Sequence, residues 1–296
     1  MIVTGARGYL GARIVAGLSG IAEVAAIARP GSQRADDYAV DLLDRRALAR
    51  LMAEFTPDHV IHASGRVSGA PDELHRDNVA TTLTLGEAVA HAAPRAILTV
   101  LGSAAEYGLP CSSALIAETH PCAPVTAYGR AKLEATRGIL ALSERHGLRA
   151  NIVRPFNLID APLSPAQVLG AFVAHAAAVR HDAPPREIAM GPLGAIRDFV
   201  AVGDLVHLLA TLIQRDRNGV LVNVCSGEGR CVRDIVHRLN ALAGHRFKII
   251  EPTAQVHGAN AIVGDPARFR ALTGRVRPTP IEPLIRRAWR EAIGAL

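Results

Sequence analysis

The chain has 296 residues, of which 49% are hydrophobic and 20% charged, and its formal net charge is +6 at pH 7. These values exclude a disordered protein and leave room for one large α/β domain or two smaller units. Arginine is scattered along the chain without a block of like charges. The charge therefore indicates a solvated basic surface or a phosphorylated small-molecule partner rather than nucleic acid.

The cysteines and the hydropathy pattern bear on metal binding, membrane contact and cellular location. The chain opens in an apolar strand rather than a basic leader, and no apolar run approaches the roughly eighteen residues that a membrane span needs. The cysteines form no CxxC pair and have no histidine spacing suited to zinc. We therefore expect reduced thiols, no metal site, no membrane contact and a cytoplasmic location.

Strand-like and helix-like segments alternate through the first half of the chain. Strands are predicted at Met1–Thr4, Val24–Ala28, His59–Ala63, Ala96–Leu101 and Arg149–Arg154. Helices are predicted at Tyr9–Leu18, Ala47–Phe55, Asn78–Ala92 and Ala127–Arg145. Short apolar runs separated by helices are typical of a parallel sheet buried on both faces. The pattern predicts a Rossmann-like, doubly wound sheet, with any ligand at the carboxyl ends of its strands.

The second half has a different composition. Residues 156–196 are rich in Pro, Ala and His, and prolines break the tail. Two segments, Phe199–Val202 and Val220–Val224, are expected to return to the sheet as late strands. We predict a dinucleotide-binding domain over residues 1–155, with a sheet return near 197–225. A smaller, irregular α/β region over 156–196 and 226–296 is expected to bind substrate.

A glycine-rich turn follows the first strand. Gly5, Gly8 and Gly11 lie three residues apart, between the apolar run Ile2–Val3 and a predicted helix. In such a turn the first glycine permits the tight bend, the second lets backbone approach a pyrophosphate, and the third allows close packing of helix and strand. The N-terminus of the helix then presents N–H groups to the phosphates. The turn predicts a dinucleotide-binding site.

The end of the second strand bears on the choice of cofactor. A carboxylate there would bind the adenosine ribose of NAD, but this chain has Ala28 and then Arg29, with Arg34 close behind. Arginine suits a 2′-phosphate, so NADP(H) is favoured and NAD(H) is the alternative. Arg7, inside the glycine turn, is also expected to face the phosphates.

A second group of residues bears on chemistry. Tyr128 and Lys132 lie four apart on a predicted helix and share one face. A cationic lysine beside a phenol favours phenolate, so we expect the pKa of Tyr128 to lie below its usual value. Tyr128 is then a candidate general acid or base for a carbonyl or carbinol. Ser103, after the buried strand Ala96–Leu101, is placed to hydrogen-bond the same oxygen.

Taken in order, several stretches resemble the extended short-chain dehydrogenase/reductase family, in particular its enzymes of nucleotide-sugars. The matching stretches are TGARGYLG (4–11), DLLD (41–44), VIHASG (60–65), NVATT (78–82), GSAAEYG (102–108), YGRAK (128–132), RPFN (154–157) and RDFVAVGDL (197–205). They span nearly the whole chain in family order. The resemblance implies a nucleotide-diphosphate sugar as substrate.

The resemblance also implies roles for individual residues. The implied catalytic residues are Ser103, Tyr128 and Lys132. The implied cofactor contacts are Gly5, Arg7, Gly8, Tyr9, Leu10, Gly11, Arg29, Asp41, Leu42, Ala63, Ser64, Gly65, Tyr128 and Lys132. The implied substrate contacts are Ser103, Ala104, Asn157 and Arg197. Asn78 matches a residue that supports the active site, while Asp198 and Asp204 are expected to hold loop and helix ends.

Departures from the family pattern narrow the reaction. The 4,6-dehydratases of the family typically carry Thr-Asp-Glu at the positions of Ser103, Ala104 and Ala105. In this chain the next acid, Glu106, comes one position after the family's Glu, and its side chain is expected to face elsewhere. Loss of both acids disfavours dehydration. Three functions stay possible. The first is an NADPH-dependent 4-ketosugar reductase, most like the reductases of 4-keto-6-deoxy sugar nucleotides. The others are a 4-epimerase with bound NAD and a non-catalytic NADP-binding regulator. The resemblance also implies a homodimer through helices near 78–92 and 127–145.

Overall fold

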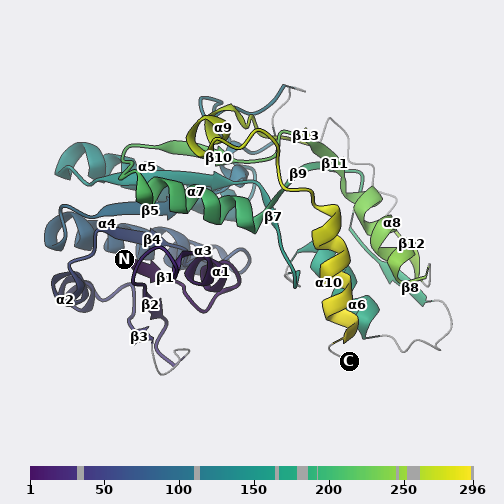
Figure 1. The fold of residues 1–296 in the computed structure, drawn as a ribbon, viewed down its shortest axis with the longest axis horizontal. Coiled ribbons are helices and arrows are strands. Elements are labelled where there is room, and N and C mark those ends of the chain that lie inside the picture. The colour runs from purple at the N-terminus through teal and green to yellow at the C-terminus, as the bar shows by residue number, and fades with distance from the viewer. Residues whose placement is uncertain are drawn as a thin grey trace.

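The computed structural model describes residues 1–31, 37–109, 114–163, 167–178, 186–191, 193–244, 247–251 and 261–294. Figure 1 shows two lobes side by side along the long axis of the molecule. The first lobe is built on a large sheet with helices on both faces. The second lobe contains shorter strands and the C-terminal helix.

The sheet of the first lobe has seven parallel strands in the order β10-β6-β5-β4-β1-β2-β3. Their bounds are Ile2–Thr4 (β1), Ala25–Ala28 (β2), Tyr38–Ala39 (β3), His59–His62 (β4), Ile97–Leu101 (β5), Ala150–Pro155 (β6) and Leu221–Val224 (β10). The order runs outward from β1 in both directions, so the switch point lies between β1 and β4, where such sheets bind ligands. The predicted Rossmann-like fold is confirmed.

Helices cover both faces of this sheet (Figure 1). One face packs on α1 (Tyr9–Leu18), α7 (Val202–Gln214) and α9 (Ala267–Thr273). The other packs on α2 (Arg45–Phe55), α4 (Thr81–Ala92) and α5 (Ala127–His146). Because both faces are covered, β1, β2, β5 and β6 are buried along their length and β4 and β10 along most of it, which explains their mainly apolar sequences. The two-residue edge strand β3 is exposed.

The second lobe has its own hydrophobic core. Its helices are α6 (Val168–Ala177), α8 (Val232–Leu242) and α10 (Glu282–Gly294). One small sheet has the order β11-β9-β13, with β7 also paired to β9, and a second joins β12 to β8. The strands are β7 (Asn157–Ile159), β8 (Arg186–Ala189), β9 (Ile196–Ala201), β11 (Gly229–Cys231), β12 (Phe247–Ile250) and β13 (Ala261–Ile262).

One strand was predicted to lie in a different sheet from the one in which it is found. Val220–Val224 was expected to return to the central sheet, and β10 does so beside β6. Phe199–Val202 was expected to do the same, but this prediction is wrong, because β9 pairs with β7, β11 and β13 instead. The reason is that β10 occupies the side of β6 opposite β5, with Val222 and Val224 fully buried. An apolar run alone does not specify which sheet takes it.

The helix predicted from Asn78 begins earlier. The described chain is helical from α3 (Pro71–His75) through a π-helical turn, η1 (Arg76–Ala80), into α4. Asn78 lies in this turn and is buried. π-Helical turns are rare and often occur at functional sites.

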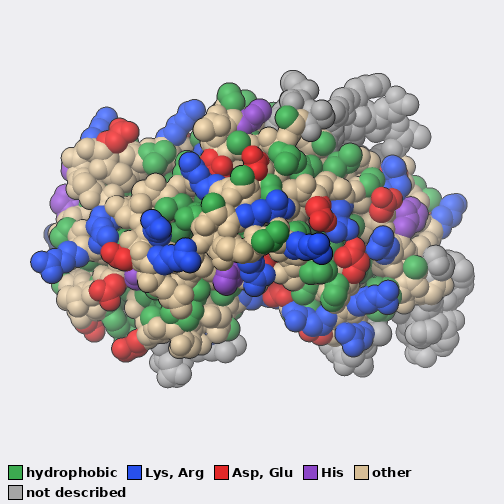
Figure 2. All heavy atoms as spheres, turned by 45° about the horizontal axis from the view of Figure 1, so that its top comes forward, with side chains coloured by type: hydrophobic (Ala, Val, Ile, Leu, Met, Phe, Trp, Pro, Cys, Tyr) green, Lys and Arg blue, Asp and Glu red, His purple; other side chains and the backbone are tan. Residues whose placement is uncertain are grey.

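The surface carries mixed charge. Figure 2 shows Lys and Arg side chains spread over one face with Asp and Glu among them. This agrees with a solvated basic surface. Within the described residues no helix is both long and apolar enough to cross a membrane, and no cluster of His, Cys, Asp and Glu is arranged to hold a metal ion.

Candidate active site

The glycine turn packs tightly against its neighbours. Gly5 has φ of +68°, and a Cβ there would lie 2.7 Å from the backbone nitrogen of Ser64. A Cβ on Gly11 would lie 2.0 Å from the carbonyl oxygen of Gly5. Both positions therefore require glycine, the first for its left-handed backbone and the second for close packing of α1 on β1. The turn is shaped as a dinucleotide-binding turn must be.

The N-terminus of α1 faces the carboxyl edge of the sheet. Gly8 is its N-cap residue, no side-chain cap holds it among the described residues, and its first turn has no acid. The backbone N–H groups of Tyr9, Leu10 and Gly11 lack intrahelical acceptors by position. Such a helix end attracts a phosphate through its N–H groups and its dipole. The geometry fits the pyrophosphate of a dinucleotide.

The structure adds an acid to the predicted cofactor site. Arg7 forms a two-pronged ion pair with Asp37, whose side chain is fully buried. Arg29 lies exposed just after β2, and Arg34 falls outside the described residues. Asp37 could not be identified from the sequence, because it lies nine positions after the end of β2 and reaches the glycine turn only when the chain folds back.

The loop after β4 joins the cofactor turn to the catalytic helix. Ala63 and Ser64 pack on Gly5, while a Cβ on Gly65 would lie 2.7 Å from Oδ1 of Asn78 and 3.4 Å from Nζ of Lys132. Asn78 accepts a hydrogen bond from the backbone N–H of Arg66 and donates to its carbonyl. Asn78 thereby holds this loop, as expected for a supporting residue.

Ser103, Tyr128 and Lys132 come together at the carboxyl edge of the sheet. Ser103 follows β5, and Thr126 caps α5 so that Tyr128 falls in its first turn. The hydroxyl of Ser103 hydrogen-bonds the Tyr128 side chain. Nζ of Lys132 lies 5.9 Å from the Tyr128 ring centre and donates to the carbonyl oxygen of Leu101 at 2.9 Å. The four-residue spacing of Tyr128 and Lys132 therefore correctly predicted that both lie on one helix.

The electrostatics of this group differ from one expectation. Burial raises the pKa of Tyr128, the bond with Ser103 opposes this, and the charge of Glu106 adds to it. The expectation that the pKa of Tyr128 lies below its usual value is therefore wrong here, because burial outweighs any pull from Lys132. Burial lowers the pKa of Lys132 to about 8, against an opposing effect of Glu106. At neutral pH Tyr128 is a protonated phenol, which suits a proton donor.

The residues beside Ser103 bear on dehydration. Ala104 is buried in a core cluster with Tyr107 and Phe156, rather than lining an open surface. Glu106 is fully buried, and its carboxylate is bonded to Arg154 and to the backbone N–H of Ser103. Its carboxylate is therefore engaged within the fold, and Ala104 and Ala105 carry no acid. The acids that a dehydratase of this type would need are absent from positions 104 and 105.

The other predicted contacts follow β3 or lie on the short strands β7 and β9. Asp41 and Leu42 follow β3, where Leu42 is buried in the core and Asp41 accepts a hydrogen bond from the backbone of Leu43. Asn157 opens β7 and donates to the carbonyl of Asp198 at 2.9 Å. Arg197 is half-buried in β9, and burial lowers its pKa. Their roles toward cofactor and substrate stay predictions.

Two buried acids hold loop and helix ends, as expected. Asp198 accepts hydrogen bonds from the backbone of Ser226, Gly227 and Gly264 and from the Ser226 hydroxyl. Asp204 accepts from the side chain of Arg275 and from both the backbone and hydroxyl of Thr279. These carboxylates hold loop ends.

The fold and this group of residues define a dinucleotide-dependent enzyme that acts at a carbonyl or carbinol. The family model described as the NAD dependent epimerase/dehydratase family matches residues 1–225. The chain belongs to this family, which confirms the resemblance drawn from the sequence motifs.

Curated relatives and solved structures agree with this assignment. The chain is 31% identical over 260 residues to dTDP-6-deoxy-L-talose 4-dehydrogenase (NAD(P)(+)) of Kitasatospora kifunensis, covering 85% of this chain and 81% of that one. It is 28% identical to GDP-6-deoxy-D-mannose reductase of Pseudomonas aeruginosa, covering 93% and 90%. It is also similar to the structure of RMD from Pseudomonas aeruginosa complexed with NADPH, with a TM-score of 0.84, 25% identity and coverage of 100% and 99%.

Proposed function

We propose that this chain is an NADPH-dependent reductase of a nucleotide-diphospho-4-keto(-6-deoxy) sugar. The observation that carries the proposal is the Ser103–Tyr128–Lys132 group on a dinucleotide fold, with Ala104 and Ala105 in place of a dehydratase's acids. The relatives named as a 4-dehydrogenase and a reductase of 6-deoxy sugar nucleotides support the same reaction class.

The three side chains have distinct parts in this reaction. When bound, NADPH supplies the hydride that reduces the C4 carbonyl. Tyr128 donates its phenolic proton to the carbonyl oxygen as negative charge develops there. Ser103 donates a hydrogen bond to the same oxygen, which stabilises that charge. Lys132 would hold the nicotinamide ribose, and its ammonium group favours the phenolate that remains on Tyr128.

The cofactor and substrate would lie at the carboxyl edge of the sheet. The backbone of the glycine turn would hold the pyrophosphate of NADPH, and Arg29 would pair with its 2′-phosphate. Asn157 and Arg197 would bind the nucleotide diphosphate of the sugar, since β7 and β9 carry them from this edge into the second lobe. RMD from Pseudomonas aeruginosa, which has the same fold, is complexed with NADPH.

A 4-epimerase with bound NAD is the second candidate, and Asp37 favours it. A carboxylate near the glycine turn suits the ribose diol of NAD, and the pair with Arg7 places one there. The pair also neutralises one of the arginines that a 2′-phosphate would attract. The family description covers epimerases as well.

Incubation with NADPH and a panel of nucleotide 4-ketosugars tests the proposal. A fall in nicotinamide absorbance with one of these sugars is the expected result. Interconversion of two hexose nucleotides without net NADPH oxidation would support the epimerase instead. Absence of both activities across the panel would contradict the assignment.

A homodimer through α4 and α5 belongs to the same proposal. The family resemblance supports this pairing, and α5 leaves the apolar side chain of Leu140 exposed on its surface. Light scattering coupled to size-exclusion chromatography should give twice the chain mass of 31.3 kDa. A monomer mass at micromolar concentration would contradict it.

A further inference from the structure

A buried carboxylate lies directly beneath the catalytic loop. Glu106 belongs to η2 (Ala104–Tyr107), the short 3-10 turn that follows Ser103, and its side chain has no exposed area. A Cβ on the preceding Gly102 would lie 2.4 Å from Oε1 of Glu106, so glycine leaves the space that the carboxylate fills. A charge in so closed a place needs several partners.

Glu106 has partners on three different elements. Oε1 accepts hydrogen bonds from the backbone N–H of Ser103 at 2.9 Å and from the hydroxyl of Thr136 at 3.1 Å. Oε2 accepts from Nε of Arg154 at 2.8 Å. Ser103 lies on the catalytic loop, Thr136 on α5 and Arg154 on β6. One carboxylate therefore connects the loop, the helix and the sheet.

Thr136 occupies an informative place on α5. It lies one turn beyond Lys132 and two turns beyond Tyr128, so all three share one face of the helix. Its bond to Glu106 fixes the rotation of that face relative to Ser103. The distance between the Ser103 hydroxyl and the Tyr128 phenol depends on this rotation.

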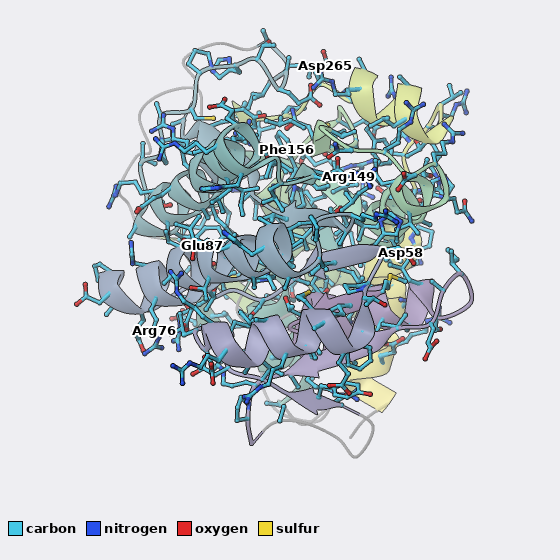
Figure 3. All side chains as sticks on the ribbon, turned by 90° about the vertical axis from the view of Figure 1, so that its left-hand side faces the viewer. Asp58, Arg76, Glu87, Arg149, Phe156 and Asp265 are labelled. Carbon is cyan, nitrogen blue, oxygen red and sulfur yellow. The ribbon has the colours of Figure 1, made fainter. Side chains whose placement is uncertain are left out.

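Arg154 fixes Glu106 from the other side. Its guanidinium also donates to the Tyr107 hydroxyl at 3.0 Å, and that hydroxyl donates to Asn223 of β10 at 2.8 Å. Phe156, labelled in Figure 3, follows β6 and packs in the same cluster as Tyr107. Glu106 is thus held by a satisfied polar network and has little freedom to move.

We propose that Glu106 is a positioning residue that holds Ser103 and the Tyr128–Lys132 face of α5 in one register for proton transfer. The inference rests on the proposed function, since it assigns a part in the same carbonyl reduction. Glu106 does not touch substrate; it acts through the backbone of Ser103 and the hydroxyl of Thr136.

The charge of Glu106 acts in the same place. It raises the pKa of both Tyr128 and Lys132. Other titratable and charged side chains among the described residues surround Glu106 and its partners. They are His62 of β4, Tyr107 of η2, Cys122 in the loop before α5, Tyr128 and Lys132 of α5, and Arg154 of β6. By itself, loss of the carboxylate charge should therefore lower the pKa of Tyr128.

A double-mutant cycle separates positioning from general stability. Glu106→Gln should lower kcat/KM for the ketosugar at least about tenfold, because small displacements of reacting groups are costly. In a Ser103→Ala background the same change should cost less than about threefold, since no hydroxyl is left to misplace. Equal losses in both backgrounds would overturn the proposal.

Two further variants provide controls. Asp204→Asn removes the charge from another buried acid paired to an arginine, Arg275, far from Ser103 along the chain. It should leave kcat unchanged at temperatures where the variant is folded. Thr136→Val keeps the pair of Glu106 with Arg154 and removes only the tie to α5, so it should lower kcat about threefold. An unchanged kcat in Thr136→Val would overturn the proposal even if Glu106→Gln fails to fold.

A titration without substrate keeps this test independent of the reaction. The chain has four tyrosines, so ¹³Cζ-tyrosine NMR can follow Tyr128, assigned with Tyr128→Phe. Loss of the Glu106 charge alone would lower the pKa of Tyr128, whereas loss of the Ser103 hydrogen bond, which has the larger effect, would raise it. Glu106→Gln should therefore raise the pKa of Tyr128 relative to the native protein, and Asp204→Asn should not. A lowered or unchanged pKa in Glu106→Gln would show that Ser103 keeps its place and would overturn the proposal. A native protein inactive on every ketosugar would instead overturn the proposed function.

Discussion

The two lobes are built by different rules. In the first, strands and helices mostly alternate along the chain, and the buried strands are mainly apolar runs. In the second, short strands pair across long separations, as when β8 (Arg186–Ala189) meets β12 (Phe247–Ile250). Buried polar groups such as Asp198 hold its loops. The first lobe is therefore specified by local pattern, and the second by contacts distant in sequence.

This difference separates two kinds of function. The first lobe supplies the cofactor turn and Ser103, Tyr128 and Lys132, all at the end of a strand or the start of a helix. The second lobe supplies the residues predicted to meet the substrate, Asn157 and Arg197, on short strands. A chemistry shared by many proteins can reside in the regular lobe while specificity varies in the other.

The largest effect is expected from Tyr128→Phe in the first lobe. Loss of the phenolic proton should lower kcat by about 10²- to 10⁴-fold, the usual contribution of a general acid. NADPH binding, followed by nicotinamide fluorescence, should change little because the variant removes only the phenolic oxygen and leaves the glycine turn and Lys132 in place. Near-normal turnover in this variant would remove Tyr128 from the mechanism.

In the second lobe, Asp198→Ala should have the largest effect on stability. It leaves the N–H groups of Ser226, Gly227 and Gly264 without their acceptor, and the free energy of unfolding should fall by at least about 3 kcal/mol. Hydrogen exchange should rise around residues 226–231 and 264 while β1, β4 and β5 stay protected. An equal loss of protection from hydrogen exchange in both lobes would contradict the view that Asp198 holds the loops of the second lobe alone. Glu144→Ala, at an exposed position of α5, is the control.

Gly11→Ala tests the packing of the cofactor turn. Its Cβ would meet the carbonyl of Gly5, so the variant should lose about 1 to 3 kcal/mol of stability, the usual cost of overpacking, and bind NADPH more weakly. Gly20→Ala is a matched control, since its Cβ would have no neighbour within 4 Å among the described residues. Thermal melts with and without NADPH measure both effects. Equal behaviour of the two variants would contradict this account of the turn.

His62 should make the first lobe sensitive to acid. It is buried between Thr4 and Thr82, and burial, then Lys132, lowers its pKa to about 3. Between this value and the ordinary 6.5 only the unfolded chain binds the proton, so stability falls as pH drops below 6.5. The slope from His62 approaches about 1.4 kcal/mol per pH unit. Denaturant unfolding of His62→Gln should show a shallower pH dependence than the native protein; parallel curves would contradict this.

The smallest effect is expected at the adenosine end of the cofactor. Arg29→Ala should lower the kcat/KM ratio of NADPH to NADH by about tenfold, the loss of one charge-assisted contact. Asp37→Asn should raise that ratio, because it releases Arg7 from a negative partner. Steady-state kinetics with both cofactors measures these ratios. A ratio unchanged by both variants would remove these two residues from cofactor choice.

Sequence patterns predicted the first lobe well, for physical reasons. Apolar runs marked the strands of the parallel sheet, and the spacing of Gly5, Gly8 and Gly11 marked the cofactor turn. Tyr128 and Lys132 were predicted to share one face of a helix because four residues make about one helical turn, and both lie in α5. Each of these signals depends on neighbours within a few residues, so it can be read from the chain alone.

The features that the sequence did not predict depend instead on residues that are distant along the chain. Phe199–Val202 was placed in the wrong sheet because the choice depends on β10, about twenty residues further on. Asp37 pairs with Arg7 across thirty residues, and Glu106 meets Thr136 and Arg154 across 30 and 48. The pKa of Tyr128 was misjudged because burial is a property of the fold. The sequence placed Glu106 away from the reacting carbons but could not identify its partners.

The most direct test of the central claim follows a label. NADPH carrying deuterium at nicotinamide C4 is incubated with the protein and the nucleotide 4-ketosugar that supports its oxidation, and the sugar product is examined by mass spectrometry and NMR. A 4-ketosugar reductase places one deuterium at C4 of the sugar, and Tyr128→Phe suppresses this transfer. A sugar interconverted without deuterium, or label at another carbon, would contradict the assignment.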